Sequence, residues 1–185
     1  MICKFNKHLD FDKVRDFCVD LYHTLGISQI SVQGNSTGAK WECSSGPVFA
    51  NLIRGERTLE NGYREELKFA SILSELKGTV VEEFLDSLPV PVYRARILTL
   101  APGGKYSLHR DPSPRIHLPL TSNSRAFFQL EGRAVHLPAD GSIYYTDTRL
   151  EHTAYNNGDV DRIHLVAVIN NDDISTLLQK PHTII

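Results

Sequence analysis

The apolar residues near the start of the chain recur at helical spacing. From Asp10 onwards they stand three and four positions apart until Leu25, and Gly26 follows directly. This spacing is typical of an amphipathic helix that buries one stripe of side chains, and a glycine at that place is a frequent helix stop. We therefore expect a helix that begins near Asp10 and ends at Gly26.

A second near-helical period of apolar residues runs from about Tyr63 to Leu88. It predicts a second helix that ends before Pro89, because proline removes a backbone donor and clashes with the preceding turn. Gly78 lies within this stretch and could divide the helix in two, since glycine is a weak helix former.

Between the two expected helices the pattern favours short strands. Apolar runs at 28–33, 40–45 and 47–53 are bounded by turn residues, and a stretch of Gly, Asn, Ser and Thr at 34–38 separates the first run from the others. Such runs predict short strands joined by a loop.

The pattern changes after Pro91. Short runs rich in β-branched and aromatic residues follow one another, with Gly, Pro, Asn or Asp between most of them. Many short strands with regular turn signals favour an all-β barrel or sandwich over alternating βα units, and we expect a jelly roll. The expected strands are 92–100, 105–111, 115–121, 125–132, 133–139, 142–147, 152–157 and 162–170, followed by one short helix within 171–180 whose start is favoured by Asp172 and Asp173.

Composition and charge narrow the class of protein. The 185 residues are 41% hydrophobic and 23% charged, close to the globular average, so we expect a single domain over 1–185, with an elaboration at about 1–90 and a β core at about 91–170. Lys and Arg number 20 against 22 Asp and Glu, which gives a net charge of -2. No basic field attracts a polyanion, so we expect no nucleic-acid partner.

The chain carries no targeting signal that we recognise. It has no apolar segment of the kind found in signal peptides and no apolar run of about 18 residues, so we expect no membrane partner. Its three cysteines are odd in number and lack CxxC spacing, which argues against a disulfide framework or a zinc knuckle. These features predict a cytoplasmic protein with reduced thiols.

The tetrapeptide Arg-Ile-His-Leu occurs twice, at 115–118 and at 162–165. Side chains two positions apart share one face of a strand, so each Arg and His should point one way and each Ile and Leu the other. A charged face inside a barrel needs an anion, although a chance similarity between two exposed strand faces would give the same pattern. The residues on the charged face would be Arg115, His117, Arg162 and His164.

The candidate chemistry begins with His109 and Asp111. They stand two positions apart and so could reach one ion together, although HxD by itself is also common in solvated turns. His152 follows 41 residues after Asp111, and Arg162 follows ten residues after His152. Two imidazoles and one carboxylate on one side of a metal leave three positions open, as in non-haem iron(II) oxygenases, and an arginine nearby could pair with a carboxylate of a bound co-substrate.

In this combination the chain resembles the aspartyl/asparaginyl β-hydroxylase family of iron(II)- and 2-oxoglutarate-dependent oxygenases. The resemblance spans Val92 to Asn170 and lies in LHRD at 108–111, RIHLPL at 115–120 and HTAYNNGDVDRIHLVAVI at 152–169. It implies a mainly β (α+β) fold, a cupin-like double-stranded β-helix with flanking N-terminal helices. It also implies that iron is held by His109, Asp111 and His152.

The resemblance further implies that Arg162 binds the distal carboxylate of 2-oxoglutarate and that Arg115 and His117 help to hold this co-substrate. Two more residues are candidates from their positions: His164 shares a face with Arg162, and Ser107 shares one with His109. Each could contact the co-substrate or a ligand, or could be an ordinary hydrogen-bonding residue.

Arg94 and Arg96 open the first strand of the expected barrel and stand two positions apart. One or both could bind a substrate carboxylate. The competing interpretation is that they are surface arginines whose stems lie along the protein while their charged ends reach water.

The leading hypothesis is therefore an oxygenase that uses Fe(II), 2-oxoglutarate and O2. It would hydroxylate an unactivated C–H bond of an amino acid, a small acid or a peptidyl side chain, and release succinate and CO2. The alternatives are a non-redox metal-binding cupin module for a small anionic ligand and a hydrolase that uses zinc-bound water. The sequence predicts neither the substrate nor the oligomeric state.

Overall fold

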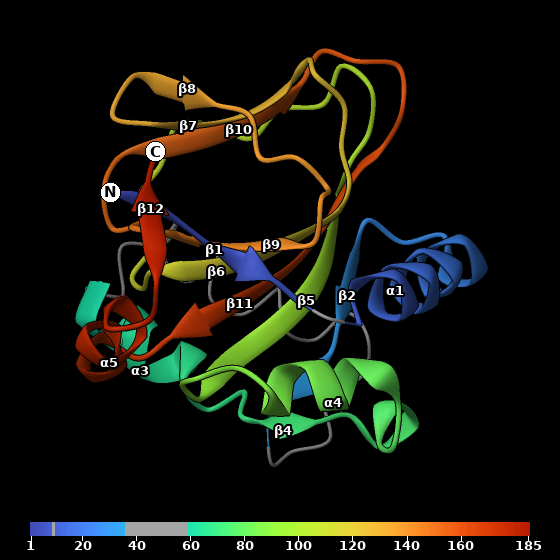
Figure 1. Ribbon diagram of the computed structural model, residues 1–185, viewed down its shortest axis with the longest axis vertical. Helices are drawn as coiled ribbons and strands as arrows, with labels where there is room; N and C mark the ends of the chain where they lie inside the picture. The colour runs from blue at the N-terminus through green and yellow to red at the C-terminus, as the bar shows by residue number, and fades with distance from the viewer. Residues whose placement is uncertain (9, 36–58) are drawn as a thin grey trace.

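Two antiparallel β-sheets face each other across the centre of the molecule (Figure 1). The computed structural model describes residues 1–8, 10–35 and 59–185. The larger sheet has the order β12-β1-β9-β6-β11-β5-β2, and the smaller has the order β10-β7-β8. The strands of the larger sheet are β12 (His182–Ile184), β1 (Ile2–Lys7), β9 (Ser142–Thr146), β6 (Arg115–Thr121), β11 (Arg162–Ile169), β5 (Val92–Leu100) and β2 (Gln29–Ser31), and those of the smaller are β10 (His152–Asn156), β7 (Ala126–Leu130) and β8 (Arg133–Val135).

This arrangement confirms the predicted jelly roll. The central strands β5, β11, β6 and β9 are hydrogen-bonded side by side without following one another in sequence, so the chain crosses repeatedly between the two sheets. All strand pairs within the described part of the chain are antiparallel. The fold is mainly β with a few flanking helices, as expected.

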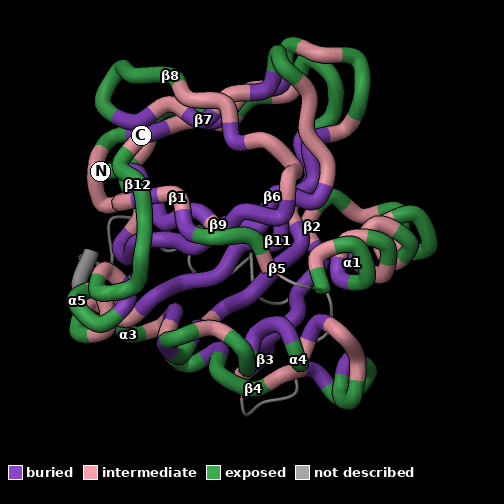
Figure 2. The backbone as a smooth tube through the Cα atoms, viewed as in Figure 1, coloured by how far each residue is buried: buried purple, intermediate pink, exposed green. Residues whose placement is uncertain are grey.

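The larger sheet has an apolar face and a polar face, and β11 illustrates the division. Ile163, Leu165, Ala167 and Ile169 belong to the main hydrophobic core, which lies between this sheet and the helices. Figure 2 shows the buried backbone of the central strands running through the middle of the molecule. The alternate positions of β11 face the space between the two sheets, so strand alternation aims one set of side chains at the core and the other at the cavity.

The first predicted helix is confirmed as α1 (Phe11–Leu25). It buries Val14 and Cys18 against the core and packs on α4 (Val80–Asp86). Gly26 ends it with φ of 65°, and the backbone N–H of Gly26 donates to the carbonyl of Tyr22. Glycine is favoured there because other residues pay a steric cost for left-handed backbone.

The second predicted helix is wrong as a continuous element. The stretch holds α3 (Leu59–Glu66), the short strand β4 (Ser71–Ile72), the 3-10 helix η1 (Ser74–Leu76) and α4. Gly78 has φ of 73°, which an α-helix does not accommodate. The backbone between α3 and η1 bonds to strands instead, since Leu73 N–H donates to Val32 at 3.0 Å and Phe69 O accepts from Arg94 at 2.7 Å.

Other expectations meet mixed outcomes. The strands expected from 92 onwards form, apart from 105–111, which makes only isolated bridges at Lys105 and His109. The run 28–33 forms β2 and the start of β3 (Gln33–Gly34), whereas the strands expected at 40–45 and 47–53 lie outside the described residues. The short helix after β11 is confirmed as η2 (Asn171–Asp173) and α5 (Ile174–Leu178). Strands β1 and β12 were not predicted.

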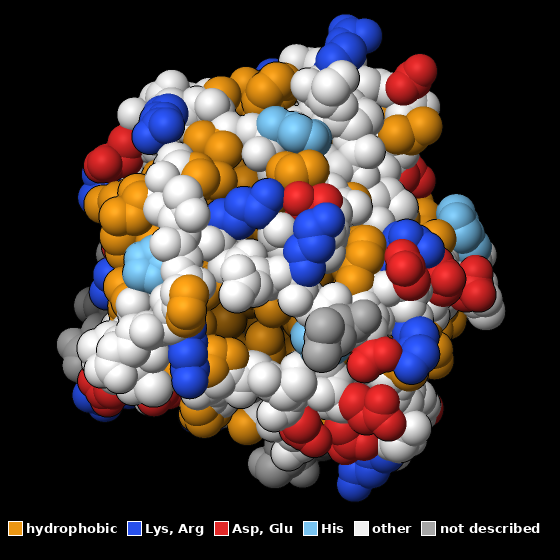
Figure 3. Space-filling model, viewed as in Figure 1, with side chains coloured by type: hydrophobic (Ala, Val, Ile, Leu, Met, Phe, Trp, Pro, Cys, Tyr) orange, Lys and Arg blue, Asp and Glu red, His pale blue; other side chains and the backbone are white. Residues whose placement is uncertain are grey.

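The surface carries charges of both signs. On the face drawn in Figure 3, acidic side chains gather at the lower right with lysines and arginines among them. In the described part of the chain, no helix is both long enough and apolar enough to cross a membrane.

Candidate functional site

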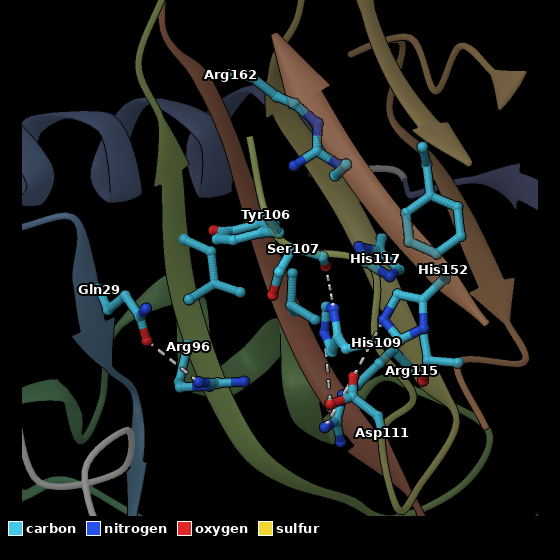
Figure 4. Close-up of a pocket in the computed structure, with 15 residues that line it drawn as sticks. Gln29, Arg96, Tyr106, Ser107, His109, Asp111, Arg115, His117, His152 and Arg162 are labelled. Atoms are coloured by element: carbon cyan, nitrogen blue, oxygen red, sulfur yellow. Dashed lines mark hydrogen bonds and ion pairs between the residues drawn. The ribbon is translucent and has the colours of Figure 1, made fainter. Parts of the chain in front are cut away.

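A cavity of about 420 Å³ lies between the two sheets (Figure 4). Its size is within the range of small-molecule sites, roughly 300 to 1,000 Å³. Its walls combine apolar residues with a small number of converging polar groups. The polar lining residues are Gln29, Arg96, Tyr106, Ser107, His109, Asp111, Arg115, His117, Thr148, His152 and Arg162.

His109, Asp111 and His152 come together at one side of this cavity. Their ligand atoms all lie within 4.8 Å of one another, so the three side chains could hold a metal ion. His152 is the first residue of β10, while His109 and Asp111 belong to the segment between β5 and β6. Backbone bonds fix the three positions, because His109 and His152 exchange N–H···O bonds of 3.0 and 2.9 Å and Asp111 N–H donates to Thr148 at 2.8 Å.

The hydrogen bonds of the two imidazoles define their tautomers. Nδ1 of His109 is 2.7 Å from the carbonyl of Ser107, and Nδ1 of His152 is 3.0 Å from the carbonyl of Leu150. A carbonyl only accepts, so both Nδ1 atoms carry the proton and both neutral rings present Nε2 as an electron-pair donor. Backbone carbonyls commonly orient metal-binding histidines in this way.

The Nε2 atoms converge on the Asp111 carboxylate. Nε2 of His152 is 3.5 Å from one carboxylate oxygen, and Nε2 of His109 is 4.0 Å from the other. Electron pairs that meet at such distances repel one another unless a proton or a cation lies between them. Two imidazole nitrogens and one carboxylate oxygen form a donor set that suits iron(II) and other divalent transition metals.

Arg115 keeps the Asp111 carboxylate ionised. Burial alone would raise the pKa of Asp111, but the guanidinium of Arg115 outweighs burial and holds this pKa well below its usual range. Arg115 donates to Asp111 at 3.2 Å. The group is therefore a charged ligand at neutral pH.

The same arginine is also held by Glu66, the last residue of α3. Arg115 donates to the two carboxylate oxygens of Glu66 at 2.7 and 3.0 Å, and Arg94 forms a further ion pair with Glu66. Ser113 donates to Glu66 at 2.6 Å. Glu66 is fully buried, and the opposing effects of burial and of its two arginine partners leave its pKa lowered. A buried carboxylate thus joins α3 to the candidate metal site.

Sequence reasoning missed Glu66. Positive and negative residues alternate in the run 54–68, a pattern typical of a solvated face, yet Glu66 is completely buried. No local signal could have found it, because Arg94 and Arg115, which neutralise Glu66, lie 28 and 49 residues further along the chain.

Arg162 and His117 both line the cavity, as their strand positions predicted. Arg162 is only 4% exposed, and no ion pair joins it to any described residue. Burial lowers the pKa of Arg162 to about 10, still well above neutral, so the side chain is a buried cation. His117 shares a hydrogen bond of 3.0 Å with Thr146, and burial together with the cations of Arg162 and Arg115 lowers the pKa of His117 well below its usual value.

His164 and Ser107 are placed differently. His164 is completely buried beside His117, outside the cavity lining, and neither of its ring nitrogens has a partner among the described residues. Ser107 lines the cavity, and its backbone carbonyl accepts the hydrogen bond from His109. The alternation predicted for the repeated tetrapeptides is confirmed, because Ile116, Leu118, Ile163 and Leu165 all belong to the core on the opposite face.

Arg94 and Arg96 are not the surface arginines of the competing interpretation, since both are buried. A bulge separates them: Val166 pairs with Arg96 and Val168 pairs with Tyr93, so two residues of β5 stand opposite one of β11. Arg94 has φ of 49° and turns to Glu66. Arg96 alone of the pair lines the cavity.

The fold and the site together define a cupin-like jelly roll with a candidate mononuclear metal centre. The family model for aspartyl/asparaginyl β-hydroxylase matches residues 56–171. The chain belongs to this family, as its motifs predicted, and is therefore an enzyme of the oxygenase class.

Several solved structures are similar to part of the chain. They include a predicted oxalate decarboxylase from Thermotoga maritima (23% identity, 49% of this chain and 75% of that one, TM-score 0.37). A cupin domain from Bordetella pertussis shows 18% identity over 43% of this chain and 81% of its own, with a TM-score of 0.35. A Cupin 2 conserved barrel protein from Salinispora arenicola shows 17% identity over 50% and 75%, with a TM-score of 0.37. No curated protein matches the chain.

Proposed function

We propose that the chain is an iron(II)- and 2-oxoglutarate-dependent hydroxylase. One arrangement carries this proposal. Two histidines that present Nε2 and one ionised aspartate lie together in a cavity that also holds the buried cation Arg162. The donor set fits iron(II), which His109, Asp111 and His152 would hold on one side. When bound, iron with 2-oxoglutarate and O2 supplies the oxidation that converts R–H to R–OH and yields succinate and CO2.

Arg162 would bind the distal carboxylate of 2-oxoglutarate. A guanidinium forms paired, charge-assisted hydrogen bonds with a carboxylate, and a buried guanidinium without an anion is unfavourable. The distal carboxylate of the co-substrate would neutralise Arg162, and this ion pair would strengthen the binding of 2-oxoglutarate. This binding would hold the co-substrate in one orientation at the metal side of the cavity.

The neighbouring residues would keep the site ordered and dry. His117 stays neutral at pH 7 because its pKa is lowered, so it can accept or donate a hydrogen bond without adding a charge beside Arg162. Arg115 is already bound by Glu66 and Asp111, so we assign it to the orientation of Asp111, with a direct contact to the co-substrate as a secondary role. The apolar walls include Leu98, Phe128 and Val166 and would exclude water from the reaction.

An anaerobic titration tests the proposal. Apo-protein receives Fe(II) and then 2-oxoglutarate, and the visible charge-transfer band of a chelated 2-oxo acid is recorded. We expect a band that needs both additions and that disappears in Asp111→Ala. Iron binding without a band would contradict the proposed use of 2-oxoglutarate as the co-substrate.

Turnover provides a second readout. His109→Ala, Asp111→Ala and His152→Ala should each abolish iron-dependent formation of succinate, since each removes one of the three proposed ligands. Full activity in any one of these variants would show that its residue is not a ligand. Arg133→Met, on the exposed strand β8, is the matched control and should remain active.

A further inference from the structure

The cavity contains a second buried cation that the proposed co-substrate does not use. Arg96 lies on β5 and Arg162 on the adjacent strand β11, where Arg162 pairs with Leu100 and Val166 pairs with Arg96. The backbone positions of the two arginines are therefore four residues apart along the strands, about 13 Å at ~3.3 Å per residue. Figure 4 shows them separately, with Arg162 at the top and Arg96 at the lower left beside Gln29. Two separate anions fit this spacing better than one.

Arg96 and Gln29 together present only donors to the cavity. Arg96 donates to the side-chain oxygen of Gln29 at 3.3 Å, and its Nε is buried without a partner among the described residues. The guanidinium fixes the orientation of the Gln29 amide, because the oxygen must face the cation and the NH2 group must then face away. A guanidinium beside an amide NH2 is suited to the two oxygens of a carboxylate.

Among the described residues, no carboxylate is left to compensate the charge of Arg96. Glu66 bonds to Arg94 and Arg115, and Asp111 bonds to Arg115. In the part of the chain that the structure describes, three guanidinium groups thus neighbour two carboxylates, and a divalent metal at Asp111 would add positive charge. Burial, and then the nearby cations of Arg94 and Arg115, lower the pKa of Arg96 to about 9. An anion bound at Arg96 would relieve this excess of positive charge.

We propose that Arg96 and Gln29 form the subsite that binds the carboxylate of the oxidised substrate, and that this substrate is a small carboxylic acid of the amino-acid kind. This inference rests on the proposed function and specifies its substrate class. The carboxylate would lie at Arg96 while the rest of the molecule extends along the apolar wall at Leu98 towards the metal side. Hydroxylation then takes place at a C–H bond remote from the bound carboxylate.

The test measures succinate release in the presence of each proteinogenic L-amino acid and, as a matched pair, its carboxamide. A third arm uses a tripeptide with central aspartate and blocked ends, which offers a side-chain carboxylate without a free acid terminus. We expect at least one free acid to raise succinate release above the rate without added substrate, and its carboxamide to fail. Arg96→Met should raise the KM for that acid about tenfold or more, since a charge-assisted contact is lost.

A second variant guards against simple misfolding. Gln29→Glu would place a carboxylate against Arg96, which satisfies the cation internally and leaves no room for an external anion. We expect this variant to bind 2-oxoglutarate, as judged by the charge-transfer band, and to lose the response to the acid. Arg162→Met should show the converse, with the larger loss in 2-oxoglutarate affinity.

Each contrary result has a defined meaning. Carboxamides that act as well as acids, or an unchanged KM in Arg96→Met, would overturn the subsite. A response to the blocked peptide alone would overturn the small-acid source and assign the carboxylate to a peptide side chain. Absence of the band in the unmodified protein contradicts the proposed function and the subsite with it, whereas a band without a response to any acid contradicts the subsite alone.

Discussion

The guanidinium of Arg115 bridges Glu66 and Asp111, with contacts of 2.7 and 3.0 Å to the first carboxylate and 3.2 Å to the second. Glu66 ends α3 and Arg115 begins β6, so the bridge connects a helix outside the jelly roll to a proposed metal ligand inside it. The orientation of Asp111 therefore depends on a residue that never reaches the cavity.

Removal of Glu66 should destabilise the protein strongly. Glu66→Ala leaves Arg94 and Arg115 buried without their shared partner, and breaking a buried ion pair in this way costs about 3 to 5 kcal/mol. Urea unfolding would measure the loss. Glu65→Gln is the matched control, because its salt bridge with Lys68 is largely exposed and should change stability by less than about 1 kcal/mol.

Loss of the Glu66 carboxylate should also weaken metal binding, since Arg115 would no longer be held in place beside Asp111. We expect the affinity for Fe(II) to fall roughly tenfold in a folded Glu66→Gln variant. Isothermal titration below the unfolding transition measures this affinity. An unchanged affinity would show that Asp111 is positioned without help from α3.

Arg162→Met should weaken 2-oxoglutarate binding by about 2 to 3 kcal/mol, the value of a charge-assisted hydrogen-bonded contact. The affinity for Fe(II) should stay near that of the unmodified protein, because Arg162 contacts none of the three proposed ligands. The charge-transfer band, titrated with 2-oxoglutarate at saturating iron, separates the two affinities. Equal 2-oxoglutarate affinity in both proteins would assign the distal carboxylate to another cation.

Stability should fall as the pH drops from 7 towards 5.5. Burial, followed by the cations nearby, lowers the pKa of both His117 and His164 well below the ordinary value. The unfolded chain then binds protons near its ordinary histidine pKa while the folded protein does not, so stability is full above about pH 6.5 and is lost below it. Each histidine contributes up to about 1.4 kcal/mol per pH unit.

Urea midpoints measured between pH 5.5 and 8 check this dependence. His164→Leu should flatten the slope, because it removes one of the two groups. The control His23→Gln changes an exposed histidine of α1 and should leave the slope as it is. A slope that is the same in His164→Leu would contradict the prediction.

Gly158→Ala should destabilise the turn before β11. A Cβ at Gly158 would overlap the side-chain oxygen of Asn123, which would have to move. Asn123 donates to Asn156, and Asn156 in turn bonds to Leu100 and Val160, so the disturbance spreads through a buried polar network. We expect a loss of about 1 to 3 kcal/mol in urea unfolding.

The control for this change is Gly62→Ala. Gly62 lies within α3, and a Cβ there meets Pro112 at an ordinary 3.4 Å. Because alanine is a better helix former than glycine, this variant should be neutral or more stable by up to about 1 kcal/mol. Similar losses in both variants would mean that contact with Asn123 is not the cause.

Local patterns predicted the parts of the site that depend on strand alternation. The repeated Arg-Ile-His-Leu placed Arg115, His117 and Arg162 on the cavity side because a period of two needs no knowledge of distant partners. The grouping of His109, Asp111 and His152 followed from family motifs and is reproduced by the geometry. Strand alternation depends only on neighbouring residues, and the three proposed ligands are found by the order of their motifs along the chain.

Features that depend on distant contacts were not predictable in the same way. Glu66 is buried only because Arg94 and Arg115 arrive from two strands of the larger sheet. The bulge that separates Arg94 from Arg96 arises from pairing with β11. Strand alternation alone would place both arginines on one face, whereas Arg96 lines the cavity and Arg94 does not. Several apolar residues within 63–88 are buried, as their spacing predicted. The continuous helix does not form, because part of the backbone bonds to other segments and Gly78 has a φ that a helix does not accommodate.

The two-sided character of β11 restricts how this protein can diversify. Arg162 faces the cavity while Ile163 and Leu165 fill the core. One inserted or deleted residue in the strand would therefore exchange the two sets, bury charge in the core and remove the Arg162 cation from the cavity. Point substitutions at Arg96 or Gln29 carry no such penalty for the register. A lineage could therefore exchange one substrate for another by single replacements on β2 and β5, while changes of length are confined to the loops between strands.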